Sequence, residues 1–400
     1  MSVRKIITAT LHATVLTLLT LVWMNLSWEF SDEVIVARIN QVVKYLLVGA
    51  EDAQVAQFKK NLLLINGSYD KSLIPFEDDR GSGNQPVTDR DKLAKMMALL
   101  ADAPTPPALV VLDLFLEDPS PHDSILRHHL QRLPAVLISA NTNSSGTMNR
   151  PWPQLHYGLP YYETTSGMFL KYQLAREEGL HLATAMFAIT HGENLWYQFG
   201  LLRSANGWWH NTFLLDFPLR RSHIECNELL LWNLGEALAL FEPTDIQAIA
   251  ANRIVIVGDF VKYDNHETLL GEQPGPLIVA NAYLALLKET PRLRLTDGML
   301  IFILYFAATI YLLQFRHQRQ RLFFERLRAW RGARIVLRYF SYLLLFSIYS
   351  ILLYLLTNRH FQLFLFALYF QLLEWFTDRH LRVARHRTFE EEKESTHAID

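Results

Sequence analysis

The residues best suited to bind a ligand are two acids that follow apolar runs of the kind found in buried strands. Asp113 comes at the end of the run 108–112, and Asp259 directly follows the run 253–258. In open α/β sheets, ligands bind at the edge formed by the carboxyl ends of the parallel strands. Both carboxylates are therefore candidate ligand-binding groups, with a helix cap or a loop anchor as the alternative role.

A second set of polar side chains lies in the loop after Asp259. Asp264 and His266 are close enough in sequence to join Asp259 in a polar pocket or in a metal site. Zinc and calcium motifs place their ligands at tighter characteristic spacings than these three residues show. The spacing favours the pocket, and we predict a site without a metal or another cofactor.

The sequence lacks the motifs of the common catalytic machineries. Gly81 and Gly83 follow no apolar strand, so they indicate a flexible loop rather than a phosphate-binding turn. Glu193 and His191 have no second histidine at helical spacing, and neither a serine elbow nor a Walker-type lysine occurs. These observations predict that the protein is not an enzyme.

The candidate residues need a sheet to bring them together, and the central region alternates predicted strands with predicted helices. Strands are predicted at residues 61–65, 108–114, 134–139, 213–217 and 253–258. Helices are predicted after the capping sequence 88–91 and at residues 123–132, 182–190, 227–240 and 277–288. This order predicts an α/β domain with a mainly parallel sheet and right-handed crossovers.

A basic connection at residues 316–338 separates two long apolar runs. It contains eight arginines and one acid, and the runs on either side cover residues 298–315 and 339–356. A helix of about 18 residues spans roughly 27 Å, close to the thickness of a bilayer core. Because arginines near membrane helices stay on the cytoplasmic side, the connection is predicted to lie inside the cell.

Two further apolar runs complete a predicted set of four membrane spans. The run 6–24 follows Arg4 and Lys5, and its bulky end indicates an uncleaved anchor rather than a cleaved signal peptide. The run 361–376 is followed by a basic tail. The charges place both termini in the cytoplasm and residues 27–297 outside it.

Several polar residues lie within the predicted spans. His12 is expected to meet Gln371 or Glu374, because ionisable groups in a bilayer are costly unless paired; the alternative is that Glu374 reaches the inner membrane surface by itself. A stripe of small residues on one helix face favours close helix packing. It consists of Thr10, Ala13, Thr14 and Thr17.

Composition adds few constraints on partners. The net charge is −2 and the arginines gather at the predicted membrane boundary, so the basic connection is explained by orientation and by contact with lipids rather than nucleic acid. Cys226 is the only cysteine, which excludes an intramolecular disulfide. A domain of about 270 residues buries enough apolar surface without one.

The order of motifs resembles the second type of CHASE domain, an extracytoplasmic sensory domain associated with bacterial histidine kinases and adenylate cyclases. That family has one anchor before the sensor and three spans after it, and the resemblance implies a homodimer. Asp118 and Thr268 become candidate ligand-binding residues through it. The residues that carry it are 109–115, Asp118, Asp123, 253–258, Asp264, His266, Thr268, Gly275 and 280–282.

These inferences predict a sensor of the bacterial inner membrane. Residues 27–297 would bind an unknown ligand or periplasmic partner, and a shift of the helix 277–288 would pass through 291–297 into the spans at 298–377. The tail 378–400 is too short for an output domain, so the output protein is expected to be a separate chain. The alternative is a scaffolding subunit of a membrane or envelope complex.

Overall fold

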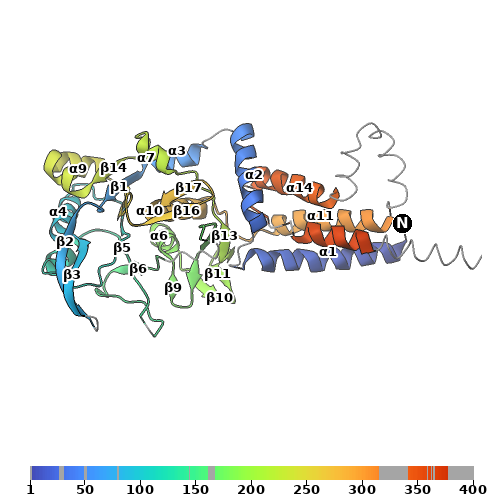
Figure 1. Cartoon of the computed structure of the whole chain (residues 1–400), viewed down its shortest axis with the longest axis horizontal. Helices are drawn as coiled ribbons and strands as arrows, with labels where there is room; N and C mark the ends of the chain where they lie inside the picture. The colour runs from blue at the N-terminus through green and yellow to red at the C-terminus, as the bar shows by residue number, and fades with distance from the viewer. Residues whose placement is uncertain are drawn as a thin grey trace, which may run out of the picture. The chain divides into compact units, whose positions relative to one another are not determined.

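The computed structural model describes the chain as two compact units (Figure 1). An α/β unit comprises Asn25–Phe30 and Gln41–Leu293, and a helical unit comprises Met1–Met24, Ser31–Asn40 and Arg294–Asp400. The residues described are 2–26, 31–48, 52–78, 81–143, 145–160, 167–314, 341–357, 359–361, 363 and 365–376. The predicted basic connection and the cytoplasmic tail lie outside them.

A six-stranded sheet forms the centre of the α/β unit. All five strand pairings in it are parallel, which confirms the predicted α/β class. In spatial order the strands are β14 (Leu231–Asn233), β1 (Leu62–Asn66), β15 (Ile254–Gly258), β4 (Leu109–Leu112), β5 (Val136–Ser139) and β6 (His156–Gly158). The strand β15, late in the chain, therefore lies between the two earliest strands of the sheet.

Both faces of the sheet are buried, because helices cover each of them. Leu62 and Leu64 of β1 point into one apolar core, and Leu63 and Ile65 point into the other. This alternation follows the two-residue period of a strand. The first core includes residues of α3 (Ala53–Lys60), α6 (Leu182–His191) and α10 (Gly275–Leu287); the second includes residues of α4 (Arg90–Ala101), α5 (Asp123–Leu130), α8 (Leu234–Leu240) and α9 (Pro243–Ala250).

Two helices show how the sequence sets these elements. The α4 helix begins after Asp89, whose carboxylate accepts hydrogen bonds from the backbone N–H groups of Asp91 and Lys92 at 3.0 and 3.2 Å. This confirms the capping prediction. The α10 helix is apolar on all sides, and every residue from its first to Leu286 is buried. Such a helix belongs to the interior of a domain.

The remaining strands form small antiparallel pairs around the main sheet. The largest group is the three-stranded sheet of β10 (Trp196–Gln198), β11 (Leu201–Ser204) and β12 (Gly207–His210). The other pairs are β2 (Lys71–Asp78) with β3 (Gly81–Thr88), β7 (Lys171–Gln173) with β13 (Thr212–Leu214), β8 (Ala175–Arg176) with β9 (Gly179–Leu180), and β16 (Asn265–Thr268) with β17 (Gly271–Pro274).

Two predictions in this unit are wrong. The helix predicted at 227–240 is instead the edge strand β14 followed by α8, because Asn227 adopts φ +57° and the apolar residues after it pair with β1. Gly81 and Gly83 belong to β3 rather than to a loop, since β3 pairs with β2 along its whole length. The short helix α7 (Arg221–Glu225) was not predicted.

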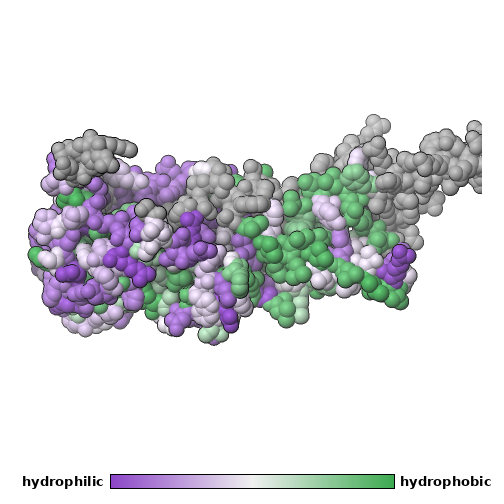
Figure 2. Space-filling model, turned by 90° about the horizontal axis from the view of Figure 1, so that it is seen from below, coloured by the Kyte–Doolittle hydropathy of each residue, from purple (hydrophilic) through white to green (hydrophobic). Residues whose placement is uncertain are grey.

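The helical unit contains α1 (Val3–Met24), the first part of α2 (Ser31–Val48), α11 (Leu295–Gln314), α14 (Ser341–Thr357) and the helix Leu365–Phe376. Tyr305 lies in its core, with the rings of Phe346, Phe366 and Phe370 at centroid distances of 5.8, 5.5 and 6.2 Å. Figure 2 shows that apolar side chains cover much of the surface of this unit.

Two of these helices are long and apolar enough to cross a membrane, not the four that the sequence predicted. They are Val3–Met24 and Leu295–Leu313. Among the described residues the other two apolar helices, Tyr342–Thr357 and Leu365–Phe376, are shorter. A helix of twelve residues spans about 18 Å, less than a bilayer core.

Candidate functional site

Asp113 lies at the carboxyl edge of the sheet, where β4, β5 and β15 end. Its backbone N–H donates to the carbonyl oxygen of Val257 on β15 at 2.8 Å, which fixes its position at the strand end. Its Oδ1 accepts a hydrogen bond from the hydroxyl of Ser139 at 2.7 Å, at the end of β5. Its Oδ2 is buried and has no hydrogen-bond partner among the described residues. One carboxylate oxygen is therefore open to a donor.

Asp264 and His266 act electrostatically on Asp113 from the segment between β15 and α10, with Asp264 directly before β16 and His266 within it. His266 Nε2 lies 2.8 Å from Asp264 Oδ1. The backbone oxygen of Asp264 accepts from the N–H of Gly275, the first residue of α10, at 2.7 Å. A Cβ on Gly275 would lie 2.1 Å from Asp264 Oδ2, so only glycine admits the carboxylate at this point. Asp264 therefore packs directly against the first residue of α10.

The charges of these three residues interact. Burial, reinforced by the negative charge of Asp264, raises the pKa of Asp113 to about 7, and the Ser139 hydroxyl and His266 act in the opposite direction. A desolvated carboxylate is stabilised by a proton, a cation or a hydrogen-bond donor. Asp113 can therefore change its charge near neutral pH or bind a cationic group in place of the proton.

Asp259 belongs to a different arrangement and has the alternative role of a loop anchor. Its carboxylate accepts hydrogen bonds from the Ser68 hydroxyl and from the backbone N–H groups of Val261, Lys262 and Tyr263. Burial alone would raise the pKa of Asp259, but these hydrogen bonds lower it below its ordinary value. The charge of Asp259 is thus used to hold the loop that carries Asp264 and His266.

The two residues suggested by the resemblance alone are also separate from Asp113. The Thr268 hydroxyl is buried, donates to the carbonyl oxygen of Gly271 at 2.7 Å and closes the turn between β16 and β17. Asp118 accepts from Gln85 Nε2 on β3 at 2.9 Å. Its charge acts on the buried guanidinium of Arg90, whose pKa is lowered by burial and raised by Asp123 and Asp118.

Sequence reasoning missed three polar residues at the same edge. Ser139 holds Asp113, and Ser68 holds Asp259. The Asn66 side chain accepts from the backbone N–H of Phe260 at 3.2 Å and donates to Asn233 Oδ1 at 2.8 Å. Asn66 and Ser139 end their strands, so the rule that selected Asp113 would have found them if applied to neutral side chains.

The polar residues of the helical unit have different partners from those predicted. His12 Nδ1 lies 2.8 Å from the Thr309 hydroxyl, and His12 Nε2 lies 2.9 Å from the Tyr369 hydroxyl. Gln371 donates instead to Glu374 at 3.3 Å. The predicted pairing of His12 with Gln371 or Glu374 is therefore wrong, because hydroxyl groups on the neighbouring helices lie within its reach.

The small-residue stripe of α1 is displaced from its predicted position. Thr10 and Thr14 are exposed, and their hydroxyls donate back to the carbonyl oxygens of Ile6 and Thr10. The buried face contains Ala13 and Thr17 as predicted, together with Ala9, Leu16 and Thr20. The Thr20 hydroxyl lies 2.6 Å from that of Tyr305 on α11, so this face packs against α11.

No protein-family model, curated protein or solved structure matches this chain. Within the part of the chain that the structure describes, no group of three or more His, Cys, Asp or Glu side chains could hold a metal ion. The contacts at the carboxyl edge of the sheet therefore carry the functional argument.

Proposed function

We propose that the protein is a membrane-anchored receptor whose α/β domain lies outside the cytoplasm and binds a ligand at the carboxyl edge of its sheet. The observation that carries the proposal is the buried Oδ2 of Asp113, which has no hydrogen-bond donor among the described residues and whose carboxylate interacts electrostatically with Asp264 at the start of α10. A ligand at Asp113 would also contact or repel Asp264. Binding at the edge would then act directly on the first turn of α10.

The α10 helix is suited to pass such a change along the chain. It is a buried rod of 13 residues, about 20 Å long, so a displacement at its start moves the whole helix. Residues 288–294 connect its end to α11, the second of the two helices that could cross a membrane. We propose that the signal continues through these helices to a separate output protein.

The chemistry of the site favours a ligand with a cationic or hydrogen-bond-donating group. Asp113 presents an acceptor without a donor, and a second acid lies beside it. An anion would meet two carboxylates, with His266 as the one basic side chain that acts on Asp113 among the described residues, which is unfavourable in a partly buried site. An organic amine replaces the proton on Asp113 and satisfies the open oxygen.

The proposed orientation follows from charge. Eight arginines at 316–338 favour a cytoplasmic connection, and the basic residues at 4 and 5 favour a cytoplasmic start. The apolar runs 339–356 and 361–376 extend beyond the two shorter helices. Together with the two longer helices they give the four proposed spans, with the α/β domain between the first and the second. The compartment that this topology predicts is the exterior face of a bacterial inner membrane.

The single cysteine gives a direct test of this orientation. Cys226 is exposed in the α/β unit. A membrane-impermeant maleimide added to intact spheroplasts should label the full-length protein, and Cys226→Ser should abolish the labelling. In the Cys226→Ser background, Gly332→Cys should be labelled only after the membrane is permeabilised. Labelling of Cys226 only after permeabilisation would refute an extracytoplasmic domain.

Ligand binding is tested with the full-length protein in lipid nanodiscs. Spermidine, which carries ammonium groups, should raise the free energy of unfolding of the α/β unit, by about 2.7 kcal/mol at a concentration of roughly 100 Kd. Glutamate should not. Asp113→Asn should remove the effect, whereas Asp245→Asn, at an exposed acid on α9, should keep it.

The same preparation separates the receptor from a scaffold. A scaffolding subunit would copurify with other envelope proteins at a constant ratio and would gain no stability from any amine. That pair of results, obtained with folded wild-type protein, would overturn the proposal.

A further inference from the structure

The α2 helix has an apolar side that the protein does not cover. Ile35, Ile39, Val42 and Leu46 are 60%, 47%, 57% and 73% exposed. Their spacing of four, three and four residues places all four on one face of the helix. A contiguous exposed apolar stripe on a protein surface marks a site of contact with another apolar phase.

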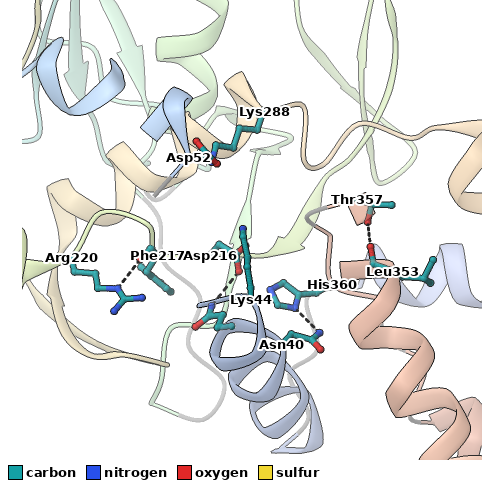
Figure 3. Close-up of polar contacts among 11 residues, drawn as sticks. Asn40, Lys44, Asp52, Asp216, Phe217, Arg220, Lys288, Leu353, Thr357 and His360 are labelled. Carbon is teal, nitrogen blue, oxygen red and sulfur yellow. Dashed lines mark hydrogen bonds and ion pairs between the residues drawn. The ribbon is translucent and has the colours of Figure 1, made fainter. Parts of the chain in front are cut away.

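The opposite side of α2 is the one that packs against the protein. Ala37 and Asn40 are buried there. One turn further along, Lys44 lies 3.9 Å from a carboxylate oxygen of Asp216, and Gln41 donates to the same side chain at 3.2 Å (Figure 3). A helix on a water-exposed surface has its apolar face inward and its polar face outward. Apart from exposed Arg38 at the edge of the stripe, the α2 helix has the reverse arrangement.

A contact within the helical unit sets the level of α2 along the membrane helices. Asn40 Nδ2 lies 3.3 Å from His360 Nδ1 (Figure 3). His360 belongs to the short connection between α14, which ends at Thr357, and the helix that begins at Leu365. A short connection between two membrane helices lies at the bilayer surface. The middle of α2 is therefore at that level.

We infer that α2 lies in the interfacial layer of the outer leaflet, with its four-residue stripe in contact with lipid. The partner is the lipid surface itself. This inference rests on the membrane placement proposed above and not on ligand binding. Helices of this kind lie in the membrane plane with their apolar side at the boundary of headgroups and acyl chains.

A second copy of the chain is the other occupant to consider. A stable protein interface buries roughly 800 Å² on each partner. Four aliphatic side chains that are already half covered supply less than this area. Lipid requires no such minimum, because the membrane helices already hold α2 at the surface. The geometry therefore favours lipid.

The depth of α2 can be measured in the full-length chain. In the Cys226→Ser background, Leu46→Cys is labelled with a nitrobenzoxadiazole dye and reconstituted in vesicles of phosphatidylcholine and phosphatidylglycerol. Leu240→Cys is the matched control, because Leu240 is also an exposed leucine, at 77%, on a helix of the α/β unit. Its expected environment is water.

A phosphatidylcholine with a doxyl group near its headgroup should quench the dye at position 46 several-fold more than the dye at position 240. Aqueous iodide should show the reverse order. Equal quenching by iodide at both positions would overturn the inference, and so would efficient disulfide cross-linking between Leu46→Cys chains. An unchanged urea transition of the α/β unit verifies that each labelled variant is folded.

The outcome is independent of the orientation test. Quenching reports depth whichever side the domain occupies, whereas labelling of Cys226 reports the side. An inverted topology with a deeply placed α2 would refute the proposed compartment and leave the lipid contact standing.

Discussion

Replacing Asn281 by leucine should strongly destabilise the α/β unit. Asn281 is buried in α10, and its amide makes three hydrogen bonds, each 2.9 Å long. Its oxygen accepts from the N–H of Leu219, and its nitrogen donates to the carbonyl oxygens of Leu219 and Leu277. The side chain therefore holds the segment around Leu219 against the helix.

The size of the effect follows from the groups left without a partner. In Asn281→Leu, the N–H and the carbonyl oxygen of Leu219 both lose the amide of residue 281 as their partner, and Leu219 is fully buried. The oxygen of Leu277 keeps its bond within the helix. An unsatisfied buried backbone group costs about 1–3 kcal/mol, so the expected loss is roughly 2–6 kcal/mol. Domains of this kind are stable by roughly 5–15 kcal/mol.

Urea unfolding of the full-length protein in detergent, followed by tryptophan fluorescence, measures this loss. Asn206→Ala is the control, because Asn206 is exposed in the turn between β11 and β12 and its side chain donates to Glu193 on the surface. Its effect should stay within about 0.5 kcal/mol. A loss of the same small size for Asn281→Leu would refute the idea that this amide fixes α10.

Three further perturbations test the site and the helical unit. Burial and the charge of Asp264 raise the pKa of Asp113 from 3.8 to about 7, so the folded state binds the extra proton and Asp113 destabilises the fold increasingly as pH rises through that window; Asp113→Asn should flatten this loss in a urea titration at several pH values. Gly258→Ala should cost about 1–3 kcal/mol in the same assay, because its Cβ would lie 2.4 Å from Cγ of Pro276. Arg359→Met should lower the free energy of unfolding of the helical unit by about 3–5 kcal/mol, because it removes the ion-pair partner of buried Asp297.

Each of these changes has a control. Asp245→Asn should leave the pH dependence of wild type unchanged, since Asp245 is exposed. Gly67→Ala should be mild, because the nearest atom to its Cβ would be Thr88 Cγ2 at 3.4 Å. Arg359→Met with Asp297→Asn should recover much of the loss. A steep pH dependence in Asp113→Asn, a mild Gly258→Ala or a double variant no better than the single one would contradict the respective argument.

Much of the fold was predictable because its central strands are continuous apolar runs. The runs that became β1, β4, β5 and β15 needed no tertiary information, since strands covered on both faces are apolar at every position. The helix α6 and most of α10 were predicted for a related reason. Their apolar residues exceed what a half-exposed helix would show.

The missed elements take their structure from partners elsewhere in the chain. The edge strand β14 is three residues long and is defined by pairing with β1. The α2 helix has its apolar residues on the side away from the protein. In the sequence these residues look like part of a buried element, but the predicted sheet has no place for one there. The strands β2 and β3 contain two glycines and two prolines, residue types that favour turns.

The candidate site was predicted in part. The strand-end rule selected Asp113 and Asp259, but Asp264 and His266, which were predicted to join Asp259, act electrostatically on Asp113. Asp259, only five residues before Asp264, turns away to bind Ser68 and the backbone of its own loop. The course of that loop depends on the serine at position 68, nearly 200 residues earlier, and no local pattern reveals it.

The position of β15 has a consequence for biosynthesis. The strand pairs with β1 on one side and β4 on the other, yet it lies about 140 residues after β4. Until residue 258 has been synthesised, β1 and β4 each keep a bare edge, and such edges promote aggregation. Truncations before Ile254 should therefore accumulate as insoluble material.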